Sequence, residues 1–234
     1  MTGKSAVVFG ASGGIGSAVA DALQSNGQFE TVIRFSRSGD TPVPVDLTSE
    51  ASIETAAAWM KDQGISPSMI FVATGLLHGD DRGPEKSLRQ LDADWLMKNY
   101  QVNAIGPALV AKYFLPLMDR KDIIRFAALS ARVGSISDNR LGGWYGYRAS
   151  KAALNMMIRN LSIEWSRKND RSIIVALHPG TVDTALSRPF QSNVAEGKLF
   201  DSGRAARHLL DVLDGLEPAD SGKIFAWDGA EIQP

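Results

Sequence analysis

The chain has 234 residues, of which 44% are apolar and 22% are charged, and its formal net charge is −1. This composition is typical of a globular protein with a sizeable core, and the near-neutral charge gives no general electrostatic reason to bind nucleic acid. Cysteine is absent, which excludes disulfides and thiolate zinc sites, and the three histidines lack metal-ligand spacing, so we expect no metal.

Secreted proteins and membrane-spanning proteins are two further classes that we do not expect. The first residues lack the basic, apolar and small-residue regions of a secretion signal, and no apolar run reaches the length of a membrane span. We therefore expect a cytoplasmic protein without a membrane span, whose partner is a small molecule.

Short apolar runs alternate with amphipathic segments of helix length. In chain order, the predicted elements are a strand at 6–10, a helix at 14–25, a strand at 31–36, a helix at 49–63, a strand at 69–74, a helix at about 92–118, a strand at 123–129, a helix at 146–168, a strand at 172–180, a helix at 202–213 and an edge strand at 222–229. Consecutive apolar residues are typical of strands buried on both faces. The alternation predicts an α/β fold, a single-domain doubly wound parallel sheet flanked by helices over 1–234.

In such a sheet, ligands bind at the carboxyl ends of the strands. Three less regular segments, near 76–90, 132–146 and 184–201, follow predicted strands and are expected to be the substrate loops.

Glycines follow the first predicted strand directly, as Gly10, Gly14 and Gly16 in "GASGGIG". Glycine permits a tight turn and lets backbone amides approach a diphosphate, which the N-terminus of the next helix attracts. The alternative interpretation is a glycine turn that only packs the helix close to the sheet. The spacing G-x-x-x-G-x-G also differs from the general dinucleotide motif G-x-G-x-x-G.

Tyr147 and Lys151 lie four residues apart at the start of a predicted helix, so their side chains share one face. A free phenol has a pKa of about 10, which is too high for efficient proton transfer near neutrality. A nearby ammonium favours the phenolate, so we expect Lys151 to lower the pKa of Tyr147. The pair is typical of a proton donor and acceptor.

Five segments, in order, resemble the short-chain dehydrogenase/reductase family: "GASGGIG" at 10–16, "VDL" at 45–47, "VNAIGP" at 102–107, "YRASK" at 147–151 and "HPGTVDT" at 178–184. The resemblance covers nearly the whole chain and is strongest to the C-factor group. It implies a Rossmann-type fold, a nicotinamide cofactor and a homodimer or homotetramer formed through the long helices at 92–118 and 146–168.

The second strand indicates which cofactor is preferred. Ser36 stands where an aspartate would repel phosphate, and Arg37 follows with a guanidinium suited to the 2′-phosphate of NADP(H). The alternative interpretation is that Arg37 is a solvated loop residue. NADP(H) is therefore expected over NAD(H).

The resemblance also assigns residues to the cofactor. They are Gly10, Ser12, Gly14, Ile15, Gly16, Ser36, Arg37, Asp46, Leu47, Ala73, Thr74, Gly75, Lys151, Pro179, Gly180, Val182 and Thr184. Within this set Asp46 and Leu47 would contact the adenine, Thr184 the carboxamide and Lys151 the ribose. Ala73 replaces the family's usual asparagine.

The catalytic residues that the resemblance implies are Tyr147, Lys151, Asn103 and Ser130. Asn103 would join a water and the lysine in a proton relay, or it is a helix-interior residue that bonds a neighbouring carbonyl. The family's serine normally lies three residues before a glycine, and counting back from Gly134 gives Ala131, one place after Ser130. Three outcomes stay open: Ser130 is re-aimed by the strand end, Ser135 replaces it, or no serine contributes.

The sequence thus predicts an oxidoreductase that transfers hydride between NADP(H) and a carbonyl or secondary alcohol, with Tyr147 as general acid and base. The alternative is a C-factor-like signalling or regulatory protein that binds the nucleotide with weak or no turnover. A lipid hydrolase is disfavoured because no G-x-S-x-G elbow is present.

Overall fold

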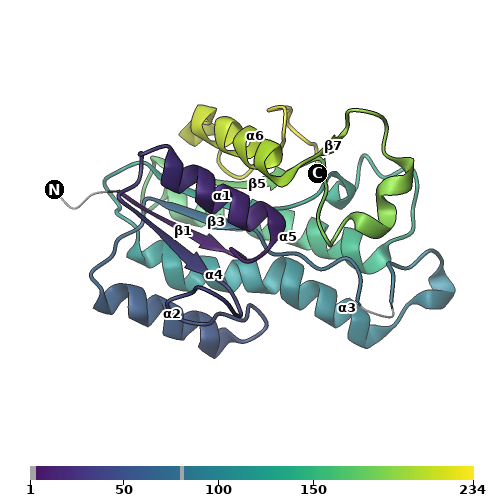
Figure 1. The fold of residues 1–234 in the computed structure, drawn as a ribbon, viewed down its shortest axis with the longest axis horizontal. Coiled ribbons are helices and arrows are strands. Elements are labelled where there is room, and N and C mark those ends of the chain that lie inside the picture. The colour runs from purple at the N-terminus through teal and green to yellow at the C-terminus, as the bar shows by residue number, and fades with distance from the viewer. Residues whose placement is uncertain (1–3, 80–81) are drawn as a thin grey trace.

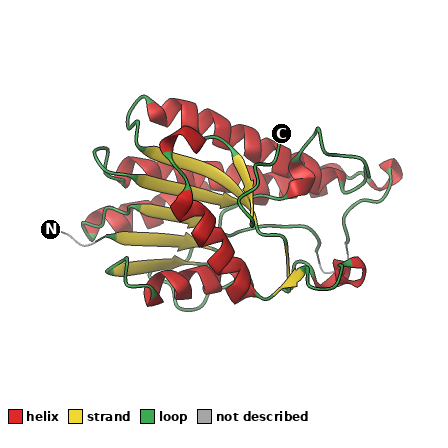
Figure 2. Ribbon diagram, turned by 90° about the horizontal axis from the view of Figure 1, so that it is seen from above, coloured by secondary structure: helices red, strands yellow, loops and turns green. Residues whose placement is uncertain are grey.

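A computed structural model describes residues 4–79 and 82–234. In this part of the chain, six parallel strands form one sheet in the order β2-β1-β3-β4-β5-β8 (Figures 1 and 2). The strands are β1 (Ser5–Phe9), β2 (Thr31–Phe35), β3 (Met69–Val72), β4 (Ile124–Leu129), β5 (Ser172–His178) and β8 (Ile224–Ala226). The order runs outward in both directions from the middle of the sheet, so the predicted doubly wound α/β fold is confirmed.

Helices cover both faces of the sheet. Helices α1 (Gly14–Ser25) and α6 (Ser202–Gly215) lie on one face, and α2 (Glu50–Asp62), α4 (Gly106–Phe114) and α5 (Tyr145–Ser166) cover the other (Figure 1). Val7 and Phe9 of β1 pack toward α2 and α4, whereas Ala6 and Val8 pack toward α1 and α6. Consecutive apolar residues in the strands therefore serve two hydrophobic cores. No helix in the described ranges is long and apolar enough to cross a membrane.

The helix expected at 92–118 is not one regular helix, and that prediction is corrected. Helix α3 (Ala93–Tyr100) is followed by a π-helical turn at Gln101–Ile105, then by α4 and a short 3₁₀ turn at Leu115–Leu117. The Gly106 N–H donates to the Gln101 carbonyl, which closes the wider turn. Pro107 has no N–H to donate to the carbonyl four residues back, so a regular α-helix cannot continue through this point.

Two short strands were not predicted. β6 (Thr181–Val182) and β7 (Leu199–Phe200) pair in parallel and join the two ends of the segment at 184–201. Between β5 and β6 the chain turns at Gly180, whose φ is +75°, so β5 ends at His178 rather than at the predicted 180. A two-residue strand has no recognisable hydrophobic period, which explains why the sequence did not indicate it.

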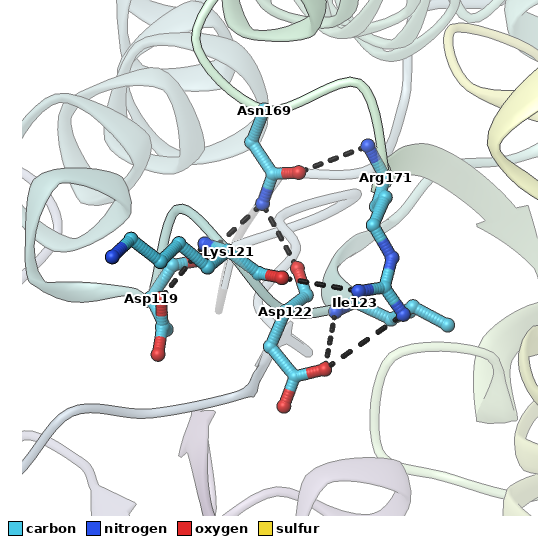
Figure 3. Close-up of polar contacts among 6 residues, drawn as sticks. All are labelled: Asp119, Lys121, Asp122, Ile123, Asn169 and Arg171. Atoms are coloured by element: carbon cyan, nitrogen blue, oxygen red, sulfur yellow. Dashed lines mark hydrogen bonds and ion pairs between the residues drawn. The ribbon is translucent and has the colours of Figure 1, made fainter.

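At the amino ends of β4 and β5, one asparagine joins the two preceding loops (Figure 3). The buried Asn169 donates through Nδ2 to the carbonyl oxygens of Asp119 and Asp122, at 3.3 and 3.0 Å, and accepts from the Arg171 amide through Oδ1 at 2.9 Å. Arg171 in turn donates to the Lys121 carbonyl at 3.0 Å. These bonds fix the amino ends of β4 and β5, and the carboxyl ends of the same strands reach the candidate active site.

Candidate active site

Two backbone hydrogen bonds to the last residue of β2 fix the turn between β1 and α1. Gly10 has a φ of +77°, and the amides of Gly10 and Ala11 both donate to the Phe35 carbonyl, at 2.9 and 3.1 Å. A Cβ on Gly16 would collide with the Gly10 carbonyl oxygen, so only glycine lets α1 start this close to the turn. This geometry accounts for the packing of the helix against the turn, and the approach of a diphosphate to the glycines stays a prediction.

The N-terminus of α1 is open to a ligand. Within the described ranges, no side chain caps it and its first turn carries no acidic residue. Because the first amides of a helix lack intrahelical acceptors and the helix dipole adds partial positive charge there, this end favours an anionic group.

A cavity of about 490 Å³ lies beside this turn, at the carboxyl ends of β1, β2 and β3. Nine residues predicted to hold the cofactor line it: Gly10, Ser12, Ser36, Arg37, Asp46, Leu47, Ala73, Thr74 and Gly75. Arg37 is exposed, and Ser36 donates to the Ser38 carbonyl at 2.6 Å. The Thr48 amide holds the pKa of Asp46 below its usual range, so Asp46 stays an anionic acceptor.

An adenine dinucleotide fits this cavity chemically. The hydroxyl of Thr74 is buried without a hydrogen-bond partner among the described residues, which is unusual unless a ligand supplies one. The α1 amides suit the diphosphate, and the Arg37 guanidinium suits a further phosphate.

A second cavity, of about 630 Å³, continues the site toward β5 and α5. Five further predicted cofactor residues line it: Ile15, Pro179, Gly180, Val182 and Thr184. Gly14 lines neither cavity but lies against Thr184 and Ser202, since a Cβ on it would come within 3.0 Å of the Thr184 methyl carbon. Gly16 and Lys151 also lie outside both linings.

Tyr147 and Lys151 are both buried in the first turns of α5, and Tyr147 lines the second cavity. The Lys151 ammonium lies 5.8 Å from the centre of the Tyr147 ring and donates to the Leu129 carbonyl at 2.7 Å. The four-residue spacing thus brings the two side chains together on one face of the helix.

The expected direction of the Tyr147 pKa is wrong for the protein alone. Burial raises the pKa of Tyr147 to about 12 and lowers the pKa of Lys151 to about 7. Desolvation disfavours the charged form of each group, and for Tyr147 it outweighs the attraction that an ammonium would exert. The protein therefore holds Tyr147 as a protonated phenol.

Asn103 lies in the π-helical turn and is fully buried. Its side chain bonds both backbone groups of Leu76, accepting from the amide and donating to the carbonyl, each at 2.8 Å. It also donates to the Ser150 hydroxyl at 3.0 Å, next to Lys151 in α5. Asn103 therefore fixes the segment after β3 against the helix that carries the Tyr147–Lys151 pair, and its relay role stays a prediction.

The serines near the end of β4 form hydrogen bonds to other residues than Tyr147, although Ser130 also lines the second cavity. Ser130 donates to Asn155 Oδ1 at 2.7 Å, and both side chains are buried. Ser135 accepts from the Asp138 amide at 3.1 Å and lines a separate depression. Ala131 instead packs its methyl group in one apolar cluster with Tyr147.

All three predicted substrate loops contribute to the wall of the second cavity. Leu77 comes from the loop at 76–90, Trp144 from 132–146 and Phe190 from 184–201, while residues 80–81 lie outside the described ranges. The Trp144 ring lies 5.1 Å from Phe190 and 6.3 Å from Tyr147, centre to centre. Tyr145 is half-exposed and borders the separate depression, so it does not share this wall.

The sequence analysis missed Glu85 and Arg148. Buried Glu85 accepts from the Gly146 amide at 3.1 Å and so caps the start of α5. Arg148 donates to the carbonyls of Gly142 and Gly143, at 3.2 and 3.1 Å, which ties the loop at 132–146 to α5. No short-range sequence pattern marks Glu85, because this cap lies 61 residues away from the helix residue that it binds. Arg148 directly follows Tyr147, and this position could have indicated a role near the site.

Comparisons with known proteins show the family of this chain. The short chain dehydrogenase family matches residues 4–195. The 1-hydroxy-2-glutathionyl-2-methyl-3-butene dehydrogenase of Rhodococcus sp. (strain AD45) is 31% identical over 97% of this chain and 98% of its own length. The C-signal protein of Myxococcus xanthus is 34% identical over 62% of this chain and 82% of its own length.

A solved structure shows the same fold. The NADPH-bound carbonyl reductase from chicken fatty liver superposes with a TM-score of 0.85 at 25% identity, over 99% of this chain and 94% of that one. The family match, the dehydrogenase relative and the shared sheet agree with one another. The chain belongs to the short-chain dehydrogenase/reductase family of oxidoreductases, with the C-factor-like relatives that its motifs indicated.

Proposed function

We propose that this protein reduces aldehydes or ketones, or oxidises the corresponding alcohols, with NADP(H) as the hydride carrier. One observation carries the proposal: Tyr147 is a buried phenol, and it lines the same cavity as Pro179, Gly180 and Thr184. The family resemblance assigns all three residues to the cofactor and Thr184 to its nicotinamide carboxamide. A carbonyl in this cavity would meet a proton donor and the hydride carrier together.

The bound cofactor supplies the hydride, and the chain handles the proton. Tyr147 donates its phenolic proton to the carbonyl oxygen as negative charge develops there. Burial keeps this phenol protonated, and Lys151, whose pKa lies at about 7, can carry positive charge beside it. That charge favours the phenolate left after transfer, so the pair works best when Lys151 is protonated.

The proposed preference for NADP(H) rests on Ser36 and Arg37. Both line the first cavity, and no carboxylate follows β2 directly where it would repel a 2′-phosphate. The chicken carbonyl reductase, which has the same fold, binds NADPH, and this supports the assignment.

A second candidate function is nucleotide-dependent signalling with slow turnover. Ala131 favours it, because a methyl group packs beside Tyr147 at the position where the family's serine is expected. The likeness to C-signal supports it as well. Both functions share the same cofactor site, and they differ in the rate of the chemical step.

Steady-state kinetics with a panel of aldehydes, ketones and quinones tests the proposal, using NADPH and NADH with the wild type and Arg37→Ala. We expect turnover with NADPH and a loss in Arg37→Ala of about one to two decades in kcat/KM for NADPH, since a charge-assisted hydrogen bond contributes roughly 1.5–3 kcal/mol. The kcat/KM for NADH, which lacks the phosphate, should change little in Arg37→Ala. Equal losses for both cofactors contradict the NADP(H) assignment, and no turnover with any carbonyl contradicts the reductase.

A further inference from the structure

The second cavity has a wall that is largely apolar. Leu77, Val133 and Leu186 lie in its wall together with the Trp144 and Phe190 rings. Burying apolar surface here contributes roughly 25 cal/mol per Å², so the body of a bound substrate is expected to be hydrocarbon or aromatic. The apolar wall alone does not distinguish one hydrophobic carbonyl compound from another.

Charged residues in the same wall give more specific information. Among the described residues that line the cavity, Arg132, Arg140 and Arg148 are cationic and Asp138 is the one carboxylate. Arg132 pairs with Asp138 at 3.3 Å, which leaves two cations without a matching anion in this described part of the lining. Burial lowers the pKa of His178 to about 4, so this neighbour is neutral and adds no further positive charge.

The two remaining guanidinium groups are placed differently. Arg148 is half-buried, and among the described residues its side chain donates to the backbone carbonyls of Val133, Gly142 and Gly143. Arg140 is exposed, and within the described ranges no carboxylate lies at salt-bridge distance from it. Burial lowers the pKa of Arg148, yet a guanidinium keeps its proton at neutral pH. Both side chains therefore add positive potential to the lining of an apolar cavity.

We propose that this cavity selects carbonyl compounds with an apolar body and a carboxylate at the end remote from the carbonyl, and that Arg140 and Arg148 recognise the carboxylate. The proposal rests on the proposed carbonyl reduction. A planar guanidinium matches a carboxylate with two parallel hydrogen bonds, which gives orientation as well as attraction. With the anion held at the arginines and the body on the Trp144–Phe190 wall, the other end of the molecule is directed to Tyr147.

Matched substrates separate this charge effect from reactivity. We would measure kcat/KM with NADPH for 4-formylbenzoate and its neutral analogue 4-formylbenzamide, and for the longer pair 4′-formylbiphenyl-4-carboxylate and its amide. The quantity compared is the acid-to-amide ratio in the wild type, in Arg140→Gln and in Arg120→Gln. Arg120 is an exposed arginine before β4, at the opposite edge of the sheet, and serves as the matched control.

For at least one of the two pairs, we expect the ratio to fall roughly fivefold in Arg140→Gln, as for loss of a solvent-exposed ion pair. The ratio should also fall as salt is raised, and it should stay at the wild-type value in Arg120→Gln. Melting temperatures of the variants show whether they fold. If neither these four aldehydes nor any other carbonyl of the panel is reduced, the proposed function fails. If the panel shows turnover but none of the four aldehydes is reduced, or if the acid-to-amide ratio is the same in the wild type and Arg140→Gln at both lengths, the reductase stands and the carboxylate subsite is overturned.

Discussion

At the scale of single residues, the environment of Tyr147 combines a proton donor with very little polar support. The Ser130 hydroxyl is bound to Asn155, and the methyl group of Ala131 packs in the cluster of Tyr147. A carbonyl oxygen that receives hydride develops negative charge, and each hydrogen-bond donor aimed at it lowers the barrier. We infer that Tyr147 serves as the main donor here and that the position of Ala131 has room for a second.

Replacing Ala131 with serine should therefore increase turnover. A new hydroxyl beside Tyr147 would donate to the same oxygen, and a net hydrogen bond of about 0.5–1.5 kcal/mol corresponds to a gain of roughly two- to tenfold in kcat. Steady-state rates of Ala131→Ser, with Ser130→Ala as the companion variant, measure this. A large loss in Ser130→Ala without a gain in Ala131→Ser would show that Ser130 is the working serine.

At the scale of elements, polar side chains set the relative positions of the pieces that carry the site. Asn103 bonds the segment after β3 to α5, and Glu85 caps the first turn of α5. At the opposite edge of the sheet, Asn169 joins the loops before β4 and β5 (Figure 3). The first two act next to the chemistry, whereas Asn169 acts only through the fold.

Asn169→Ala should therefore destabilise the protein without changing its chemistry. The substitution removes three hydrogen bonds to backbone groups of exposed residues, where water can replace part of the loss, so the bonds together contribute about 1–3 kcal/mol. Urea unfolding should show a loss in that range, while kcat/KM below the unfolding transition stays at the wild-type value. Asn26→Ala is the matched control, since exposed Asn26 accepts one amide bond, from Gln28. Equal free energies of unfolding for the two variants would contradict the role of Asn169.

At the scale of the whole molecule, the parallel sheet explains how distant segments form one site. The carboxyl ends of β1 to β5 meet at one edge, so the glycine turn, the Ser36–Arg37 pair and the Pro179–Gly180 turn line two adjoining cavities. This much was predictable from the sequence, because consecutive apolar runs and glycine turns are local signals.

The rest of the site depends on long-range packing. The pKa of Tyr147 depends on how completely α5 is buried, which no local pattern reports. Glu85 and Arg140 come from loops without a hydrophobic period, and the contact of Arg148 with the loop at 132–146 depends on how that loop folds back onto α5. The regular helix expected at 92–118 was wrong at Gln101–Ile105, although Pro107 is a visible signal for the break.

We infer that Tyr147 donates the proton while NADP(H) bound beside it supplies the hydride. The most direct measurement compares Tyr147→Phe with Tyr145→Phe, following NADPH affinity by fluorescence titration and carbonyl reduction by steady-state kinetics. Tyr147→Phe keeps the ring, so NADPH affinity should stay near the wild-type value while kcat falls by a factor on the order of 10² to 10⁴. Half-exposed Tyr145 borders a different depression, so its variant should keep wild-type rates. Near-normal turnover in Tyr147→Phe, or a greater loss in Tyr145→Phe, would contradict the claim.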